Sequence, residues 1–268
     1  MRMKMMMAVT VLWVVLLPYG VSGGLMSFLF GHSLDMAKDS VDDMYDGCSP
    51  KMDKNARGYL EKEMKEDSVL KKSWTDAEAL QKSKDAPTDI TKEQLIALYT
   101  YTSSDGDLNE RFDKATREQG PKYKTAFKYH ALHFYLTTAV QTIKAEHDKS
   151  NENDSEKKCY TVFHRTDKSF STKVLKQEVR FGSFASASLD KDRVVSGGKS
   201  CFEIYTCMGA DVSKHMQNEH RVEVLIPPYE VFKVKKISKR SEQGSLWCDV
   251  VYELKSTNKV SNFNCALF

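Results

Sequence analysis

The chain lacks any apolar run long enough to span a membrane. Its most apolar stretch, Met5 to Leu17, is shorter than the roughly 20 residues that a transmembrane helix needs, and Pro18 and Gly20 prevent its extension. Residues 259–268 contain no long apolar tail, so we expect neither a second span nor a lipid-anchor signal there. These absences predict a mature chain without a membrane span.

Familiar catalytic and nucleotide-binding signatures are also missing. The segment 197–200, Gly-Gly-Lys-Ser, lacks the earlier glycine of a phosphate-binding loop and does not open a predicted helix. No G-x-S-x-G and no Ser-His-Asp order is present, which argues against the common hydrolase templates. His130 and His133 stand three apart in a predicted helix, but neither an H-E-x-x-H motif nor a third ligand accompanies them. We therefore favour packing or surface roles for both and expect no metal.

A large excess of charge of one sign is absent as well. The chain carries 40 Lys and Arg against 37 Asp and Glu, a formal net charge of +3. Removal of Arg2 and Lys4 with a leader peptide would lower this charge to +1, so nothing favours binding to nucleic acid or to an anionic membrane. The lysine-rich stretches 51–72 and 233–236 are best interpreted as solvated faces.

The amino end has the layout of a secretory signal peptide. Basic residues at positions 2 and 4 precede the apolar stretch, and the small, turn-prone Val-Ser-Gly lies at 21–23. We expect residues 1–23 to be the signal peptide, cleaved near Gly23. The remaining chain of about 245 residues suits one large domain or two small ones, and we expect it to be secreted and extracellular.

The cysteine count supports an oxidising destination. All six cysteines lie after the predicted leader, and an even number in a secreted chain favours three disulfides. Zinc is the competing interpretation, but no C-x-x-C pair exists. The sequence alone leaves fifteen pairings open among Cys48, Cys159, Cys201, Cys207, Cys248 and Cys265.

The periodicity of apolar residues changes along the chain. Residues 26–149 show helical spacing, with Asp89 or Thr91 as a helix cap and a longer helix from about Phe127 that ends near His147. A polar segment, 149–158, contains the N-glycosylation sequon at Asn153. Strands rich in β-branched and aromatic residues are then expected at 159–163, 178–188, 201–207, 222–226, 231–237 and 246–254.

This order of elements predicts an α+β fold. Helices occupy residues 24–158, and an antiparallel β-sandwich occupies residues 159–268. The strand half also carries a polar set that includes His164, Arg165 and the serines of 184–188. Strand alternation places Ser186 on the same strand face as Ser188, and Arg221 on the same strand face as Glu223. These pairs either line one cleft or are ordinary solvent-facing residues of half-buried strands.

Six segments of the helix and of the strand half carry a recognisable pattern: 127–136 (FKYHALHFYL), 159–163 (CYTVF), 179–189 (VRFGSFASASL), 201–207 (CFEIYTC), 223–232 (EVLIPPYEVF) and 264–265 (NC). In these motifs and in their order the chain resembles the vertebrate ecto-ADP-ribosyltransferases, the arginine-directed mono-ADP-ribosyltransferase family. The resemblance covers nearly all of the mature chain. It implies one integrated domain, with the helical half packed on an NAD-binding core of ADP-ribosyltransferase type.

The resemblance implies a catalytic set of an arginine, a serine and a glutamate. Ser186 takes the place of the serine and Glu223 that of the glutamate, while the arginine corresponds to Arg165 or is replaced by His164. Cleavage of the nicotinamide–ribose bond of NAD develops positive charge on the ribose, which a carboxylate stabilises. A guanidinium suits the diphosphate, and a serine hydroxyl can orient the carboxylate or the ribose.

Further residues carry roles that the resemblance implies. Tyr101 and Ser183 match positions that contact the cofactor, beside Arg165, Ser186 and Ser188; the alternatives are a helix packing residue for Tyr101 and a solvent-facing strand serine for Ser183. The resemblance also implies the disulfides Cys48–Cys265 and Cys159–Cys207, which leaves Cys201 with Cys248.

Three positions depart from the family pattern. Arg221 stands two residues before Glu223, where members that modify arginine usually carry an acid, and Glu219 can replace that acid only if the loop bulges. His164 stands beside the expected arginine, and the stretch 190–200 has no aromatic residue against nicotinamide.

We therefore expect a secreted, monomeric mono-ADP-ribosyltransferase that moves ADP-ribose from NAD to a protein arginine. NAD is its substrate, and no metal and no nucleic acid take part. A catalytically degenerate relative that binds NAD or protein, and an NAD glycohydrolase, are the alternatives.

Overall fold

The computed structural model describes residues 33–82, 89–102, 107–154, 158–194, 197–216 and 224–268. The predicted signal peptide, residues 1–23, lies outside these ranges. In the described part of the chain the α-helices come first and the strands come after them, so the α+β prediction is confirmed. The helices are α2 (Ser49–Glu66), α3 (Ser68–Lys82), α4 (Lys92–Thr102), α5 (Leu108–Glu118), η1 (Gly120–Lys122) and α6 (His130–Ser150), with the short η2 (Lys191–Arg193) and η3 (Ser213–His215) among the strands.

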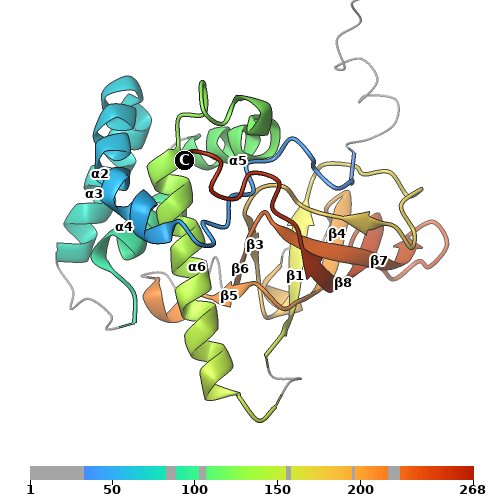
Figure 1. Ribbon diagram of the computed structural model, residues 1–268. Helices are drawn as coiled ribbons and strands as arrows, with labels where there is room; N and C mark the ends of the chain where they lie inside the picture. The colour runs from blue at the N-terminus through green and yellow to red at the C-terminus, as the bar shows by residue number, and fades with distance from the viewer. Residues whose placement is uncertain (1–32, 83–88, 103–106, 155–157, 195–196, 217–223) are drawn as a thin grey trace, which may run out of the picture.

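Helix α6 is the long helix that lies between α2, α3 and α4 on one side and the strands on the other (Figure 1). Its first turn is capped from another helix, because the Glu63 carboxylate accepts hydrogen bonds from the backbone N–H of His130 at 2.6 Å and of Ala131 at 3.3 Å. Burial raises the pKa of Glu63 to about 8. The helix begins at His130, three residues after the start expected near Phe127. It ends at Ser150, three residues after the end expected near His147.

The helix cap expected at Asp89 or Thr91 is a reciprocal one between Thr91 and Gln94 at the start of α4. The Thr91 hydroxyl accepts from the backbone N–H of Gln94 at 3.2 Å, and the Gln94 side-chain oxygen accepts from the backbone N–H of Thr91 at 2.8 Å. Thr91 is thus the cap. Asp89 instead pairs with the ring of His215, 3.0 Å away, and so links α4 to the segment after β5.

His133 is a core residue, as we favoured. Its Nε2 lies 2.9 Å from the carbonyl oxygen of Val41, which can only accept, so Nε2 carries the proton. Its Nδ1 then accepts from the Tyr45 hydroxyl at 2.9 Å. Burial lowers the pKa of His133 to about 3, so the ring stays neutral and serves the packing of α6.

The strands form a five-stranded sheet in the order β1-β4-β8-β7-β2 and a three-stranded sheet in the order β3-β6-β5. Every pair is antiparallel except β4 with β8, which is parallel. The expected sandwich is thus mixed in direction. The strands are β1 (Tyr160–Thr166), β2 (Glu178–Val179), β3 (Ala185–Ala187), β4 (Ser200–Thr206), β5 (Ala210–Asp211), β6 (Val224–Ile226), β7 (Glu230–Lys239) and β8 (Val250–Lys259).

The strand expected at 178–188 is divided between the two sheets. β2 pairs with β7 and β3 pairs with β6, and Gly182 lies between them with φ of +71°. A Cβ atom at this position would stand 2.4 Å from the Cβ of Ala37, so both the turn and the close approach require glycine. β8 begins at Val250 instead of Leu246, because residues before it form the turn that carries Cys248.

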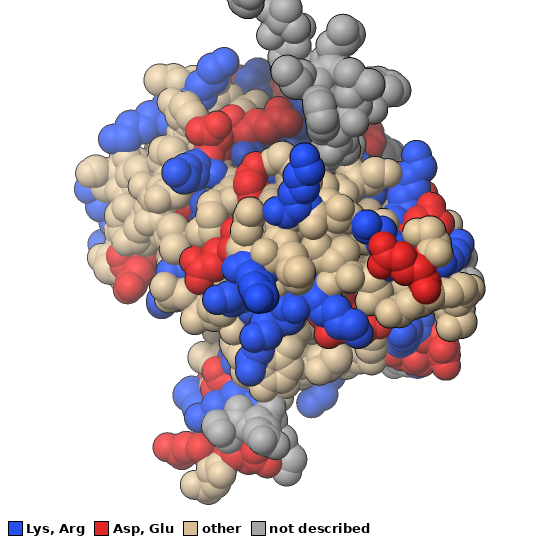
Figure 2. Space-filling view, turned by 90° about the vertical axis from the view of Figure 1, so that its right-hand side faces the viewer, with Lys and Arg blue, Asp and Glu red and all other residues tan. Residues whose placement is uncertain are grey.

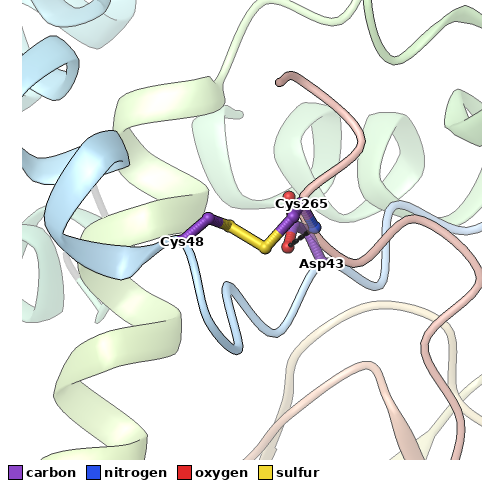
Figure 3. Close-up of side chains that lie close together, drawn as sticks. All are labelled: Asp43, Cys48 and Cys265. Carbon is purple, nitrogen blue, oxygen red and sulfur yellow. Dashed lines mark hydrogen bonds between the residues drawn. A yellow bond between two sulfur atoms is a disulfide. The ribbon is translucent and has the colours of Figure 1, made fainter.

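All three predicted disulfides are confirmed: Cys48–Cys265, Cys159–Cys207 and Cys201–Cys248. Cys159 and Cys207 each flank the paired ends of β1 and β4, where Tyr160 faces Thr206. Cys48, which precedes α2, is joined to Cys265 close to the end of the chain (Figure 3). The two ends of the described chain are therefore tied together.

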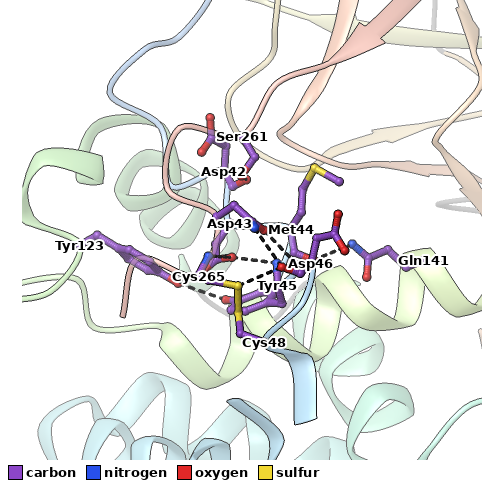
Figure 4. Close-up of a disulfide and its surroundings, with 11 residues drawn as sticks. Asp42, Asp43, Met44, Tyr45, Asp46, Cys48, Tyr123, Gln141, Ser261 and Cys265 are labelled. Carbon is purple, nitrogen blue, oxygen red and sulfur yellow. Dashed lines mark hydrogen bonds between the residues drawn. A yellow bond between two sulfur atoms is a disulfide. The ribbon is translucent and has the colours of Figure 1, made fainter. Parts of the chain in front are cut away.

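A buried carboxylate pair holds the same C-terminal segment by its backbone (Figure 4). Asp42 accepts from the N–H of Asn262 at 2.7 Å and of Phe263 at 2.9 Å, and Asp43 accepts from the N–H of Cys265 at 2.9 Å. Asp42 also forms a fully buried ion pair with Arg180, 2.6 Å from its Nη1. This cluster connects the amino-terminal segment, the start of the strand half and the carboxyl end.

Charges of both signs are interspersed with uncharged surface on the face shown in Figure 2. The lysines at 233, 235 and 236 are exposed, as the interpretation of that run as a solvated face predicts. Among the residues that the structure describes, no helix is both long and apolar enough to cross a membrane.

Candidate active site

A pocket of about 770 Å³ opens between the helical half and the strands. This volume lies in the range of sites for small molecules and cofactors. Its walls come from residues 33–34, from α4, from α5, from β1 and the loop after it, from β4, and from the segment 181–186 that leads into β3. Four of the predicted site residues line it together: Tyr101, His164, Ser183 and Ser186.

Because successive side chains of a strand point to opposite faces, only one of His164 and Arg165 can face this pocket. β1 pairs with β4 so that His164 lies opposite Phe202, and both line the pocket. Arg165 points to the other face of the sheet. There its guanidinium pairs with Asp167 at 2.9 Å and packs against Gly198, where a Cβ atom would stand 2.7 Å from the Arg165 side chain.

The His164 imidazole is fixed by a backbone contact. Its Nδ1 lies 2.7 Å from the carbonyl oxygen of Ser186, so Nδ1 carries the proton and the neutral ring has an acceptor at Nε2. Burial lowers the pKa of His164, and this hydrogen bond opposes the shift. Near neutral pH the side chain therefore brings no permanent positive charge to the pocket, in contrast to an arginine.

Tyr101 joins the helical half to the serine-bearing segment. Its hydroxyl lies 3.2 and 3.3 Å from the two carboxylate oxygens of Asp113, and 3.3 Å from the carbonyl oxygen of Phe184. Its side chain also interacts with that of Ser186. Burial holds the pKa of Tyr101 well above 10, so the hydroxyl remains a donor. Tyr101 thus both packs in the core and lines the pocket.

Ser188 lies outside this pocket although Ser186 lines it. β3 ends at Ala187, and the Ser188 hydroxyl donates to the carbonyl of Asp190 at 2.9 Å and accepts from its N–H at 3.1 Å. Its backbone bonds Phe163 of β1 in both directions, at 2.8 and 2.9 Å. In this structure Ser188 therefore shapes the turn after β3.

Helix α5 brings charged residues of both signs to the pocket wall, and the sequence did not single out its cations. Arg111 is engaged by Asp67 at 2.9 Å and Asp107 at 3.1 Å, while Arg117 donates to the carbonyl of Phe181 and pairs with Asp35 at 3.3 Å. Lys114 of α5 and Lys168 beyond β1 also line the pocket. No local motif marked these residues, because the pattern of 108–118 is that of an ordinary amphipathic helix.

The loop after β3 is held to the outer face of the larger sheet. Lys191 pairs with Glu203 at 2.8 Å, and its Nζ lies 5.1 Å from the ring centre of Trp247 and 5.8 Å from that of Phe163. Trp247 also donates to Glu203 at 3.3 Å. The aromatic residues near this loop therefore belong to neighbouring strands and turns, and they pack on the face opposite the pocket.

Glu219, Arg221 and Glu223 lie outside the described residues. Val224, the next residue after Glu223 in the sequence, begins β6 and pairs with Ala187, while Leu225 pairs with Ser186. Thus β6 runs beside the strand that carries the candidate serine.

One group of potential metal ligands lies together in the described part of the chain: Asp43, Cys48 and Cys265. Both sulfurs are consumed by the disulfide, and Asp43 accepts hydrogen bonds from backbone N–H groups and from the Tyr123 hydroxyl (Figures 3 and 4). This cluster is structural and is not suited to bind a metal ion.

The fold is that of the mono-ADP-ribosyltransferases. The eucaryotic mono-ADP-ribosyltransferase ART2.2 has been crystallised as one mutant in complex with NADH and as another in complex with NAD. These structures match this chain with TM-scores of 0.68 and 0.69, and both are 29% identical to it. Each match covers 87% of this chain and 98% of the other.

The sequence comparisons agree with the fold. The profile of the NAD:arginine ADP-ribosyltransferase family matches residues 34–259. Ecto-ADP-ribosyltransferase 4 of Mus musculus and ecto-ADP-ribosyltransferase 5 of Bos taurus are each 35% identical over 243 residues, which cover 87% of this chain and 76% and 73% of theirs. The chain belongs to the NAD:arginine ADP-ribosyltransferase family.

Proposed function

We propose that the protein binds NAD in the pocket between α5 and β3 and transfers its ADP-ribose to an arginine side chain of another protein. The observation that carries this proposal is the convergence of Tyr101, His164, Ser183 and Ser186 on one pocket in a chain of this family. The pocket volume of about 770 Å³ can hold part of a dinucleotide, and the lysines that line the pocket can attract its diphosphate.

The chemistry breaks the bond between C1′ of the ribose and the nicotinamide nitrogen. The bonding electron pair leaves with nicotinamide, and positive charge develops on the ribose. Glu223 is the residue proposed to stabilise that charge, and the Ser186 hydroxyl to orient the carboxylate or the ribose. A guanidinium nitrogen of the acceptor then bonds to C1′ and loses a proton, so that ADP-ribosyl-arginine and nicotinamide are the products.

Arg165 of β1 does not face the pocket, so other cations must bind the diphosphate. With His164 neutral and Arg165 on the opposite face, the cations that line the pocket are on α5 and at Lys168. We infer that Lys168 and Lys114 supply the attraction, because Arg111 and Arg117 already have acidic partners. This arrangement favours weaker cofactor binding than a bidentate arginine contact.

We further propose that the protein works as a monomer outside the cell. Three disulfides are typical of oxidising compartments, and the relatives above are named ecto-enzymes. Asn153, the predicted glycosylation site, is exposed just beyond the end of α6, where a glycan has room. The predicted leader, residues 1–23, supports the same destination.

Incubation of the refolded mature protein with labelled NAD and an arginine analogue tests the proposed reaction. We expect release of nicotinamide in equal amount to labelled arginine analogue. A structurally intact protein that gives neither product, beside a working relative as control, would overturn the transferase proposal. Nicotinamide release without labelled analogue would identify an NAD glycohydrolase instead.

One observation favours a second candidate, a protein that binds NAD without turning it over. His164 provides no fixed charge where the family uses an arginine, and Arg165 does not face the pocket. Calorimetry distinguishes the two functions, because saturable NAD binding with no nicotinamide release over hours indicates binding alone. Turnover eliminates this candidate.

Replacement of His164 and of Arg165 by alanine should have unequal effects on NAD affinity. His164→Ala removes a pocket wall and the hydrogen bond to the Ser186 carbonyl, so we expect NAD to bind roughly 5- to 10-fold more weakly, about 1 kcal/mol. Arg165→Ala removes a side chain from the opposite face and should leave the dissociation constant within about twofold. Calorimetric titration measures both, and the reverse order of effects would contradict the assignment of His164.

A further inference from the structure

Asp113 of α5 places a carboxyl group in the wall of the pocket. Its oxygens accept from the Tyr101 hydroxyl at 3.2 and 3.3 Å. The arginines of the same helix turn to other acids, Arg111 to Asp67 and Asp107, and Arg117 to Asp35. Within the described ranges, Asp113 therefore forms hydrogen bonds with Tyr101 but no ion pair.

The groups around Asp113 compensate a negative charge on it only in part. From α4 comes Tyr101, whose hydroxyl stays protonated; from β1 comes His164, whose pKa is lowered by burial. Lys168, beyond β1, is the cation that opposes the effect of burial on Asp113. The remaining charged groups of the pocket wall lie on or beside α5: Asp107, Glu110, Arg111, Lys114, Arg117 and Glu118.

Burial dominates this balance and raises the pKa of Asp113 to about 8. The carboxyl group is therefore largely protonated at neutral pH and mostly ionised above pH 9. In the neutral form it can offer an O–H donor to a ligand while the other oxygen still accepts from Tyr101. In the ionised form it offers only acceptors and a negative charge.

We propose that Asp113 is a ligand-binding residue that works in its protonated form, so that the pocket takes up a proton when it binds an anionic nucleotide at alkaline pH. The proposal rests on the proposed function, in which the ligand is NAD with its charged diphosphate. An ionised Asp113 in the pocket wall would repel that diphosphate, because like charges at a partly buried site are screened less than in bulk water.

The sign of the pH dependence is set by linkage. Bound diphosphate raises the pKa of Asp113 further, so the complex holds a proton that the free protein loses above pH 8. NAD affinity is then nearly constant below about pH 7 and falls as pH rises through 8. Burial lowers the pKa of His164 below its usual 6.5, so this residue does not titrate between pH 7 and 9.

Calorimetric titration of the mature protein with NAD between about pH 6.5 and 9.5, in buffers of different ionisation enthalpy, tests the proposal. We expect the dissociation constant to rise by roughly tenfold or more between pH 7.5 and 9.5, with uptake of nearly one proton per NAD at the alkaline end. In Asp113→Asn, which keeps the size and an acceptor for Tyr101, both the rise and the proton uptake should disappear.

The matched control is Asp167→Asn. The Asp167 side chain is 78% exposed and pairs with Arg165 on the face of the sheet opposite the pocket. This variant should keep the wild-type pH dependence. If Asp113→Asn fails to fold, the wild type still tests the proposal, because NAD binding without proton uptake at alkaline pH would contradict it. The role of Asp113 alone would be overturned if NAD binds without proton uptake, or if the dissociation constant depends on pH in Asp113→Asn as it does in the wild type. Absence of NAD binding at every pH would overturn the proposed function as well.

Discussion

Replacement of Arg180 by methionine will lower the free energy of unfolding by about 3 to 5 kcal/mol, the usual cost of leaving one partner of a buried ion pair uncompensated. Arg180 is fully buried, and its Nη1 lies 2.6 Å from Asp42. The same guanidinium donates to the carbonyl oxygens of Met36, Ala37 and Val260 at 2.7 to 3.0 Å. Methionine approximates the volume of the arginine stem but satisfies none of these acceptors.

Urea unfolding with the disulfides intact measures this loss. Arg57→Met is the matched control, because 88% of the Arg57 side chain is exposed and its contact with Glu61 lies on the surface of α2; we expect no measurable change there. Adding Asp42→Asn to Arg180→Met should recover part of the loss, since it removes the unpaired charge but keeps an acceptor for Asn262 and Phe263. Equal stability of Arg180→Met and wild type would show that Asp42 finds another partner.

The importance of Arg180 could not be predicted from the sequence. Its contacts are separated from it by 138 residues on one side and by 80 on the other, and no local pattern encodes them. The cap at Thr91 could be predicted because donor and acceptor are only three residues apart. The disulfide pairing depended on the family resemblance, since six cysteines alone allow fifteen pairings.

Four residues of the pocket lining could be named from the sequence, but the orientation of the neighbouring candidates and the rest of the lining could not. The resemblance left His164 and Arg165 as alternatives, and the pairing of β1 with β4 places His164 at the pocket. Alternation along one continuous strand placed Ser188 beside Ser186, but β3 ends between them and the Ser188 hydroxyl closes a turn. Asp113 had no sequence signal, because its environment depends on how α5 packs against Tyr101 and the strands.

Glu223→Gln should abolish most of the proposed transferase activity while NAD still binds. The proposed role of the Glu223 carboxylate is to stabilise positive charge that develops on the ribose only as the nicotinamide bond breaks. Glutamine has nearly the same shape but no negative charge. We therefore expect kcat to fall by roughly 10²- to 10³-fold and the dissociation constant for NAD to stay within about threefold.

Single-turnover release of nicotinamide and calorimetric binding separate the two effects. Glu242→Gln makes the same chemical change at an exposed acid that pairs with Lys239 at the end of β7, and it should leave both quantities unchanged. An unchanged rate in Glu223→Gln would contradict the proposed role of the Glu223 carboxylate in stabilising the ribose charge. Parallel losses of binding and rate would instead give Glu223 a role in holding the cofactor, because an interaction made only in the transition state lowers kcat without weakening the ground-state complex.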